Sequence, residues 1–499
     1  MRKNENKYFF VRCEMVIFRL TKYSRTSWIL EMLLVAIFFC GESCGPSQSN
    51  RCPGQVEERW GIVFGGVDED RAYSVSIDKD GNIYIVGNFT DQADFGSGIM
   101  HAVGISDCFV LSLDSNGVFQ WVKQFGGPGR AESWEERCVA IAVDNDSNVY
   151  LTGMYAGVVD FGGGEFESSG EVDGFILSLA PDGSYRWAHP FMGSEGAVGT
   201  VIAVQKNNIW LSGTFWGTID LGSGSIGSPD QPGLFIALLD MEGRFQWIKS
   251  FEITGESSFE AVVLDLVINN EGNAVFSGSM NGTIDLGGGP LSGRNSGFVA
   301  SFDQGGDHLW SRVFTVYEDN LLSMSTANSI VTDDSSNVFV GGSFFNGIDF
   351  GSGPIVADDM EGLFIVSYNI SGEFRWARTF SRRFGKVQGH LSCNGLGLDN
   401  FGDIVLVGSF DGSVDLGGGV IQSSGNEDIF VAIFGQDGCF RWSRSYGDSG
   451  GDDNASDVVV YENKIFMIGT FENSMNFGTI SFQGIGSKDI FMVDLFPLN

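Results

Sequence analysis

Six aspartates recur at one place in a repeating pattern, each followed by a large apolar residue and a glycine. They are Asp94, Asp160, Asp220, Asp285, Asp349 and Asp415. Carboxylates are ligands that Ca²⁺ prefers, so repeated aspartates could hold metal ions, and Ca²⁺ is the one cofactor that we consider. An aspartate can instead accept hydrogen bonds from the backbone of its own turn. Asn476 takes this place in the last copy, which favours the turn, because an amide caps a turn well but ligates a metal weakly.

Two tryptophans, Trp134 and Trp216, lie outside the repeating pattern, in or beside long segments between predicted strands. An exposed indole can serve as a platform for a sugar ring, since one part of it is apolar and one part polar. The same side chain could instead cover the apolar core beneath it. We therefore take Trp134, its neighbour Glu135, and Trp216 as candidate ligand-binding residues.

A lone basic spot at Arg382, Arg383 and Lys386 interrupts the acidic segments. Guanidinium groups bind carboxylates and phosphates through strong, charge-assisted hydrogen bonds. Arg382 and Arg383 are therefore candidates either for binding an anion or for docking against a neighbouring acidic loop. The second interpretation is the simpler one.

The elements that position these residues come from a repeat that runs through most of the chain. Tryptophans recur every 60 to 66 residues from Trp60 to Trp442, and an aromatic residue follows each at the fourth place. Glycines equivalent to Gly87 and phenylalanines equivalent to Phe109 recur in step with them. Seven copies match at these landmarks, so we interpret the chain as one repeat array.

Each copy predicts four short antiparallel strands, which in the first copy are Ala72–Asp78, Ile83–Phe89, Phe109–Asp114 and Val118–Phe125. The strands are rich in β-branched and aromatic residues, and glycine- or Asn-containing turns separate them. Such a unit cannot bury both of its faces alone. The sequence therefore predicts an all-β fold, a seven-bladed β-propeller of four-stranded antiparallel blades.

The two ends of the array predict how the ring closes. Trp60–Phe64 is a lone fourth strand at the start, and the last copy ends after its third strand. We expect the N-terminal strand to complete the last blade, which would remove an exposed sheet edge.

The copies resemble the extended β-propeller repeats, often called SBBP repeats, of exported bacterial proteins. The matching pattern is G-x-F-x5-D-F-G-x-G, then D-x-F-V-x-x-L-D, then G-x-x-x-W, and it covers Trp60 to the C-terminus. The resemblance implies the fold and export, and not an activity, because members of the family are largely uncharacterised. Lipoprotein-like N-termini, which are common in such proteins, favour a membrane anchor.

Strand order assigns the connections to two faces. The tight turns between first and second strands, and between third and fourth, lie on one face, and the long connections lie on the other. We therefore expect an exported or surface-anchored binding scaffold that uses its long-loop face, with a protein or a glycan as ligand. A solvated acidic surface is the simpler interpretation of that face.

An enzyme is the alternative function. A propeller hydrolase or lyase would place its site at the central channel, where histidines and carboxylates would converge. The four histidines show no metal-ligand or triad spacing, and G-x-S-x-G, H-E-x-x-H and phosphate-loop patterns are absent. We assign no catalytic residue.

The N-terminus predicts export. Seven basic residues precede an apolar run from Trp28 to Phe39, which is too short to cross a bilayer and suits a secretory signal. We assign residues 1–43 to targeting, 44–59 to a linker and 60–499 to the propeller. Cys44 follows small residues, so it marks either ordinary cleavage or a lipid-anchor cysteine. The expected location is the outer membrane or cell surface, the periplasm or the extracellular space.

Charge and cysteines add two further expectations. Of the 29 basic and 63 acidic residues, nine basic and six acidic ones precede Trp60, leaving 20 and 57 in the remainder. Such an acidic body repels nucleic acid and anionic lipid, and we expect a monomer that meets a membrane only through an N-terminal anchor. Cys138 and Cys393 stand where other copies carry a small residue, so we expect them to be small buried core residues, while Cys52, Cys108 and Cys439 lie in different repeats and cannot be paired from sequence alone.

Overall fold

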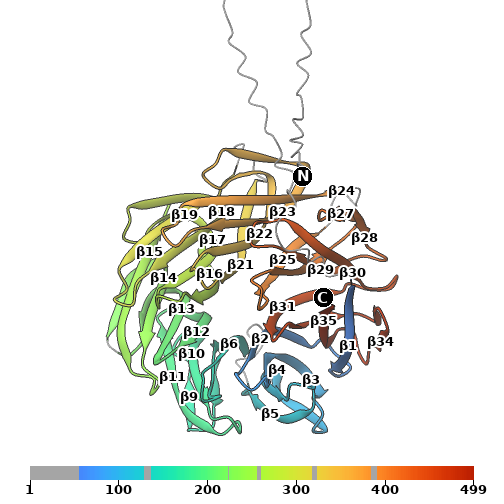
Figure 1. The fold of residues 1–499 in the computed structure, drawn as a ribbon. Coiled ribbons are helices and arrows are strands. Elements are labelled where there is room, and N and C mark those ends of the chain that lie inside the picture. The colour runs from blue at the N-terminus through green and yellow to red at the C-terminus, as the bar shows by residue number, and fades with distance from the viewer. Residues whose placement is uncertain are drawn as a thin grey trace, which may run out of the picture. The chain divides into compact units, whose positions relative to one another are not determined.

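The computed structural model describes the greater part of one compact unit, Asn50–Asn499. The described residues are 55–128, 136–222, 224–255, 260–316, 323–383 and 390–498. They form strands joined by turns, with no helix assigned among them (Figure 1). The chain has an all-β, propeller-like fold.

The first strand of each repeat lies toward the middle of the unit (Figure 1). These strands are β2 (Arg71–Ile77), β6 (Arg137–Val143), β12 (Gly196–Gln205), β16 (Glu260–Ile268), β21 (Met324–Thr332), β25 (Leu391–Leu398) and β31 (Asn454–Tyr461). Each contacts the first strand of the next repeat, and β31 contacts β2.

The second and third strands carry most of the buried side chains. The second strands are β3 (Ile83–Asp94), β7 (Val149–Tyr155), β13 (Asn208–Asp220), β17 (Ala274–Asp285), β22 (Val338–Asp349), β26 (Ile404–Phe410) and β32 (Lys464–Phe471). The third strands are β4 (Ile99–Leu113), β10 (Asp173–Leu179), β14 (Ser225–Leu239), β18 (Pro290–Phe302), β23 (Pro354–Tyr368), β29 (Asp428–Phe434) and β35 (Asp489–Leu498).

The fourth strands carry the repeated tryptophans. They are β5 (Phe119–Phe125), β11 (Tyr185–Gly193), β15 (Phe245–Thr254), β19 (His308–Val313), β24 (Phe374–Arg383) and β30 (Phe440–Tyr446). The last repeat takes its fourth strand from the start of the unit, because β1 (Gln55–Phe64) pairs antiparallel with β35 in the sheet β1-β35-β32-β31. The pairing expected for Trp60–Phe64 is therefore present.

The connections between second and third strands differ from the expected loops. Thr90–Cys108 was predicted as a loop, yet β3 and β4 continue through it as a hairpin, with Gln92 opposite His101. Short strands form the corresponding hairpins elsewhere, namely β8 (Val158–Asp160) with β9 (Glu165–Glu167), β27 (Ser413–Asp415) with β28 (Val420–Gln422), and β33 (Ser474–Phe477) with β34 (Ile480–Gln483). Several of these hairpins also pair with the fourth strand of the preceding repeat, as β13 does with β11 and β22 does with β20 (Thr315–Val316).

Apolar cores lie between neighbouring sheets. Alternate residues of a strand point to opposite faces, so Ile85 and Val86 of β3 enter different cores. Val86 packs with Leu151 and Phe175 of the next repeat, while Ile85 packs with Phe466 of the last. Each large apolar side chain buried in this way contributes roughly 1.5–3 kcal/mol relative to exposure.

The repeated glycine of the second strand is explained by a close approach of two backbones. A Cβ built on Gly87 would lie 1.9 Å from the carbonyl oxygen of Arg71, and one on Gly408 would lie 1.9 Å from that of Ser392. In β2, the residue that pairs with Gly87 is Ala72, and the register of the pairing shifts between Ala72 and Ser74. This β-bulge turns the intervening residue toward the middle of the unit, where Tyr73 lines a cavity.

Candidate functional site

The six repeated aspartates each cap the turn that follows them. Oδ1 of Asp94 accepts hydrogen bonds from the backbone N–H groups of Gly96 and Gly98, at 2.7 and 3.1 Å. The other five make the same pair of bonds to the residues two and four places later. Both glycines of the first copy have φ near +98°, which only glycine adopts without strain. The turn-capping interpretation therefore accounts for the repeated acid and glycines.

A shared metal site is not formed by these aspartates, since each stands on its own hairpin. Within the described residues, no three His, Cys, Asp or Glu side chains gather in a way that could hold a metal ion. Binding of Ca²⁺ stays a prediction that needs a direct measurement.

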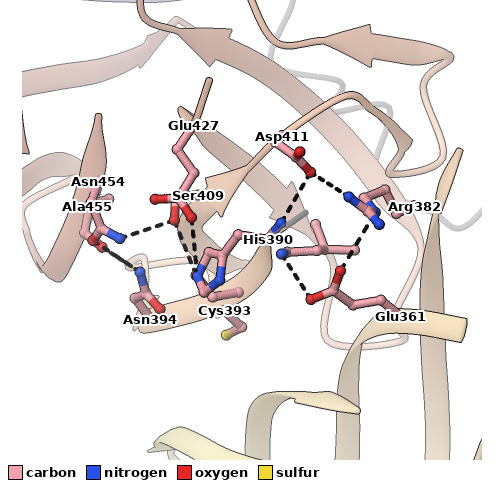
Figure 2. Close-up of polar contacts among 12 residues, drawn as sticks. Glu361, Arg382, His390, Cys393, Asn394, Ser409, Asp411, Glu427, Asn454 and Ala455 are labelled. Carbon is pink, nitrogen blue, oxygen red and sulfur yellow. Dashed lines mark hydrogen bonds and ion pairs between the residues drawn. The ribbon is translucent and has the colours of Figure 1, made fainter. Parts of the chain in front are cut away.

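Arg382 lies buried between two carboxylates (Figure 2). Its Nη1 lies 2.5 Å from Oδ1 of Asp411, and its Nε lies 3.5 Å from Oε2 of Glu361. The same two carboxylates accept backbone N–H bonds from His390 and Leu391, at 3.0 and 3.2 Å. This geometry favours docking against acidic neighbours over binding of an anion at Arg382. The side chains of Arg383 and Lys386 lie outside the described residues.

Carboxylates also meet inside the junctions between the last repeat and its neighbours. Burial, together with the charges of Asp428 and Asp448, raises the pKa of Asp453 to about 8. Burial likewise raises the pKa of Asp428 to about 6 and that of Asp70 to about 7, and the charge of Asp489 adds to the shift at Asp70. These acidic residues are therefore part of the interior, and not only a solvated surface.

Trp216 lines a cavity of about 500 Å³, to which β13, β14, β15, β16, β17, β18 and β21 contribute residues. It is 38% exposed, and the other described tryptophans are buried or half-buried. Indole N–H groups of the repeated tryptophans donate to backbone carbonyls, as Trp187 does to Met241 and Trp247 to Gln304. The indole of Trp216 has no such bond to the described residues, so its N–H is available, and the side chain is partly open to solvent. Trp134 and Glu135 lie outside the described residues.

Neutral polar side chains line the same cavity. They are Thr214 of β13, Ser279 and Asn281 of β17, Asn295 of β18 and Thr326 of β21. The hydroxyl groups of Thr214 and Ser279 make no hydrogen bond with the described residues, so they can bond to a ligand. No ionisable residue occurs among the described lining residues.

Repeat alignment explains how this lining arises, and it could have revealed the site from sequence. Thr214 and Trp216 stand one and three places after Gly213, and Ser279 and Asn281 stand at the same places after Gly278. Both pairs point to the cavity because they occupy equivalent positions on neighbouring second strands. Trp216 was predicted as a ligand-binding residue and its polar partners were not, since single polar residues carry no signal until the copies are aligned.

Small residues open the cavity at this junction. Asp428 and Asp453 fill the junction between β29 and β31, two places before Phe430 and Ala455 respectively. The same two places hold Gly233 and Ala261 here, and both line the cavity. The cavity therefore results from a departure from the acidic pattern of the last repeat.

A second cavity, of about 400 Å³, lies among the first strands. Oδ2 of Asp457 accepts bonds from the hydroxyl of Ser74 and the N–H of Val75 in β2. In the same way, Oδ2 of Asp265 in β16 accepts bonds from the hydroxyl of Ser329 and the N–H of Ile330 in β21, the first strand of the next repeat. Burial raises the pKa of Asp457 to about 7. These hydrogen bonds place both carboxylates in contacts between neighbouring repeats. No histidine occurs among the described residues that line this cavity.

Two of the cysteines form a disulfide that the sequence did not predict. Cys138 of β6 is buried as expected, and it is disulfide-bonded to Cys108 of β4, with Cα atoms 5.4 Å apart. The bond joins two repeats across their shared core, a proximity that spacing in the sequence cannot reveal. Cys393 is buried, as expected, and is free. Cys439 is disulfide-bonded as well.

The chain is similar to known proteins, but these similarities do not assign it to a family. No family model matches the chain. An uncharacterized WD repeat-containing protein of Acanthamoeba polyphaga mimivirus is 19% identical over 552 residues. The match covers 90% of this chain, and the chain spans only 39% of the length of that relative.

In the described part of the chain, no helix has the length and apolar character needed to cross a membrane.

Three solved structures with a similar arrangement of strands have low sequence identity to this chain. A protein of unknown function from Dyadobacter fermentans has a TM-score of 0.41 at 11% identity, with 89% of this chain and 99% of that chain covered. The WD40 β-propeller domain of Doa1 gives 0.41 at 10%, with 88% and 97% covered. The β-propeller domain of the Trilobed protease from Pyrococcus furiosus gives 0.40 at 5%, with 84% and 96% covered.

Proposed function

We propose that the protein is an exported or surface-anchored β-propeller of seven four-stranded blades that binds a ligand on its long-loop face. The first strands contact one another in sequence and β31 contacts β2, which supports a ring. Pairing of β1 with β35 supports closure of that ring by the N-terminal strand. The resemblance of the repeats to SBBP repeats of exported bacterial proteins is part of this proposal.

The cavity at Trp216 is the observation that carries the binding role. Its residues lie at the starts of first strands, and in the second and third strands close to where these continue into the connecting hairpin, which is the side of the long connections. An exposed indole beside hydroxyl groups that no described residue bonds offers a ligand an apolar surface together with hydrogen-bond partners. A rigid sheet behind the cavity keeps these groups in place, as a binding scaffold requires.

Three disulfide-bonded cysteines support export. Structural disulfides persist in oxidising compartments and are rare in the cytosol. The bond between Cys108 and Cys138, and the bonded state of Cys439, agree with an N-terminus that carries basic residues before an apolar run. Lipidation at Cys44 and simple cleavage before it are both forms of this proposal, and Cys44 lies outside the described residues.

Photo-crosslinking tests the binding face. A photo-reactive residue replaces either Asn295, at the cavity, or Glu242, in a turn between third and fourth strands on the opposite face, and the full chain is exposed to cell envelopes of its source organism. We expect adducts from position 295 only. Adducts from position 242 alone, or from neither position, would contradict the proposed face.

Cell fractionation with thiol labelling tests export. We expect the full chain outside the cytoplasm, with Cys108 and Cys138 protected from alkylation until a reductant is added. A cytoplasmic chain with both thiols reactive would overturn this part of the proposal. Labelling with a radioactive fatty acid, lost on Cys44→Ala, would distinguish anchoring from cleavage.

A further inference from the structure

We infer that the cavity at Trp216 binds a neutral oligosaccharide, with one sugar ring stacked on the indole. The inference rests on the proposed scaffold function and names its ligand class. It follows from three properties of the described lining: an aromatic platform, unbonded neutral polar groups and the absence of ionisable residues.

The platform is the first property. A sugar ring presents C–H groups on one face and hydroxyl groups around its edge, so it needs an apolar surface flanked by hydrogen-bond partners. Trp216 offers an exposed indole with an N–H that no described residue accepts. The only other exposed large apolar side chain in the described lining is Met324, which is too little apolar area for a hydrophobic helix or peptide face.

The polar groups are the second property. Thr214, Ser279 and Asn295 supply two hydroxyls and an amide within the same cavity. A hydroxyl group both donates and accepts, and an amide does so through two atoms, which matches the mixed donor and acceptor character of sugar hydroxyls. Ser325 is excluded from this set, because its hydroxyl is already bonded to Gly297 and Phe314.

The third property selects a neutral sugar. The chain carries a net charge of −34, so an acidic saccharide would be repelled before it reached the cavity. The described lining has no cation to pair with a carboxylate or sulfate group. The volume of about 500 Å³ falls within the range of small-molecule sites, roughly 300–1,000 Å³, and suits a short oligosaccharide.

A panel of neutral oligosaccharides (gluco-, manno-, galacto-, xylo- and N-acetylglucosamine oligomers) tests the inference, first as an array and then by calorimetry with each sugar that binds the full chain. We expect Trp216→Ala to weaken binding about tenfold or more, because it removes the stacking platform. Trp216→Phe should lose less, since it keeps an aromatic face. Thr214→Val should weaken binding through loss of a hydroxyl.

Phe345→Ala is the matched control, because Phe345 occupies the place equivalent to Trp216 in another repeat and does not line the cavity. It should leave binding unchanged, and all variants are checked for an unchanged melting temperature. Sugar binding that survives Trp216→Ala would overturn the site. If no neutral sugar binds while position 295 still crosslinks to a protein, the proposed ligand class is wrong and the proposed binding function is retained. If neither sugar binding nor crosslinking is detected, both proposals are wrong.

Discussion

An aspartate that caps its own turn makes a different thermodynamic prediction from one that ligates a metal. Asp349 accepts N–H bonds from Gly351 and Gly353 at 2.7 and 3.0 Å. A metal ligand would be sensitive to removal of the ion and to exchange for an amide. A turn cap depends only on having an oxygen acceptor in place.

We expect Asp349→Ala to lower the free energy of unfolding by about 1–2 kcal/mol, because two backbone N–H groups lose their acceptor. Asp349→Asn should cost less than about 0.5 kcal/mol, as Asn476 takes this place in the last copy. Urea unfolding with 1 mM CaCl₂ or with EDTA measures both. A stabilisation by Ca²⁺ that Asp349→Asn abolishes would show that the metal interpretation is right.

Buried carboxyls predict that the protein is more stable at mildly acid pH than at alkaline pH. With its pKa raised to about 8 in the folded state, Asp453 keeps its proton where the unfolded chain, with a value near 3.8, has lost it. The folded state then binds more protons, so the free energy of unfolding falls as pH rises from about 4 through about 8.

The melting temperature of Asp453→Asn should therefore change less between pH 5 and pH 8.5 than that of the unsubstituted chain, by about 2 °C or more. The amide mimics the protonated carboxyl and removes one titrating group, while Asp70 and Asp428 still contribute. Asp80→Asn, at an exposed turn position, is the control and should leave the slope unchanged. An equal slope in Asp453→Asn would contradict the raised pKa.

At the scale of elements, five of the repeated tryptophans donate an indole N–H to a turn of the next repeat, namely Trp121, Trp187, Trp247, Trp310 and Trp376. Nε1 of Trp310 donates to the carbonyl oxygen of Ile370 at 2.9 Å. The turn that it holds contains Gly372, with φ of +72°, and a Cβ built there would lie 2.4 Å from the indole. Tryptophan and turn glycine therefore recur together because they pack against each other.

Trp310→Phe should lower the free energy of unfolding by about 1–3 kcal/mol, since the part-buried carbonyl of Ile370 loses its donor. The same substitution at Trp216, which is exposed and holds no turn, should cost less than about 0.5 kcal/mol. Thermal or urea unfolding of the two variants gives the comparison. Equal costs at the two positions would refute the fastening role.

Strand type and order could be predicted from sequence, because landmarks recur in each copy and their spacing averages out local ambiguity. The strand starting at Arg71 was expected one residue later, and the strand ending at Phe125 was expected to begin one residue earlier. The hairpin across Thr90–Cys108 was not predicted, since its glycines suggested a loop and only its cross-strand register shows pairing. The partners of Trp216 were missed for a similar reason, because their significance comes from neighbouring repeats.

At the scale of the molecule, contacts between distant residues could not be predicted. Docking of Arg382 against acidic neighbours was the simpler interpretation of the sequence, but its actual partners, Glu361 and Asp411, could not be named from it. The disulfide of Cys138 crosses from one repeat to the next. Neither the ion pairs of Arg382 nor the disulfide of Cys138 can be predicted from composition. Both depend on which residues the packing of adjacent strands and sheets brings together.

Deletion of residues 55–64 should lower the melting temperature sharply, by about 10 °C or more, because it strips a strand from the sheet and opens the core beside β35. Adding the deleted segment back as a separate peptide should restore part of the loss. A melting temperature within about 2 °C of the intact chain would show that β1 is dispensable.

The pairing of β1 with β35 also fixes an order of events during synthesis. The strand made first in the described unit has the strand made last as its partner, so Gln55–Phe64 has no native neighbour on its free edge until Leu498 has left the ribosome. Repeats in between can form their local hairpins while the chain grows, since those contacts are short in sequence. The final sheet must wait, and until then an unpaired edge is open to other chains. Truncated or stalled chains of this protein should therefore be the forms that need a chaperone most.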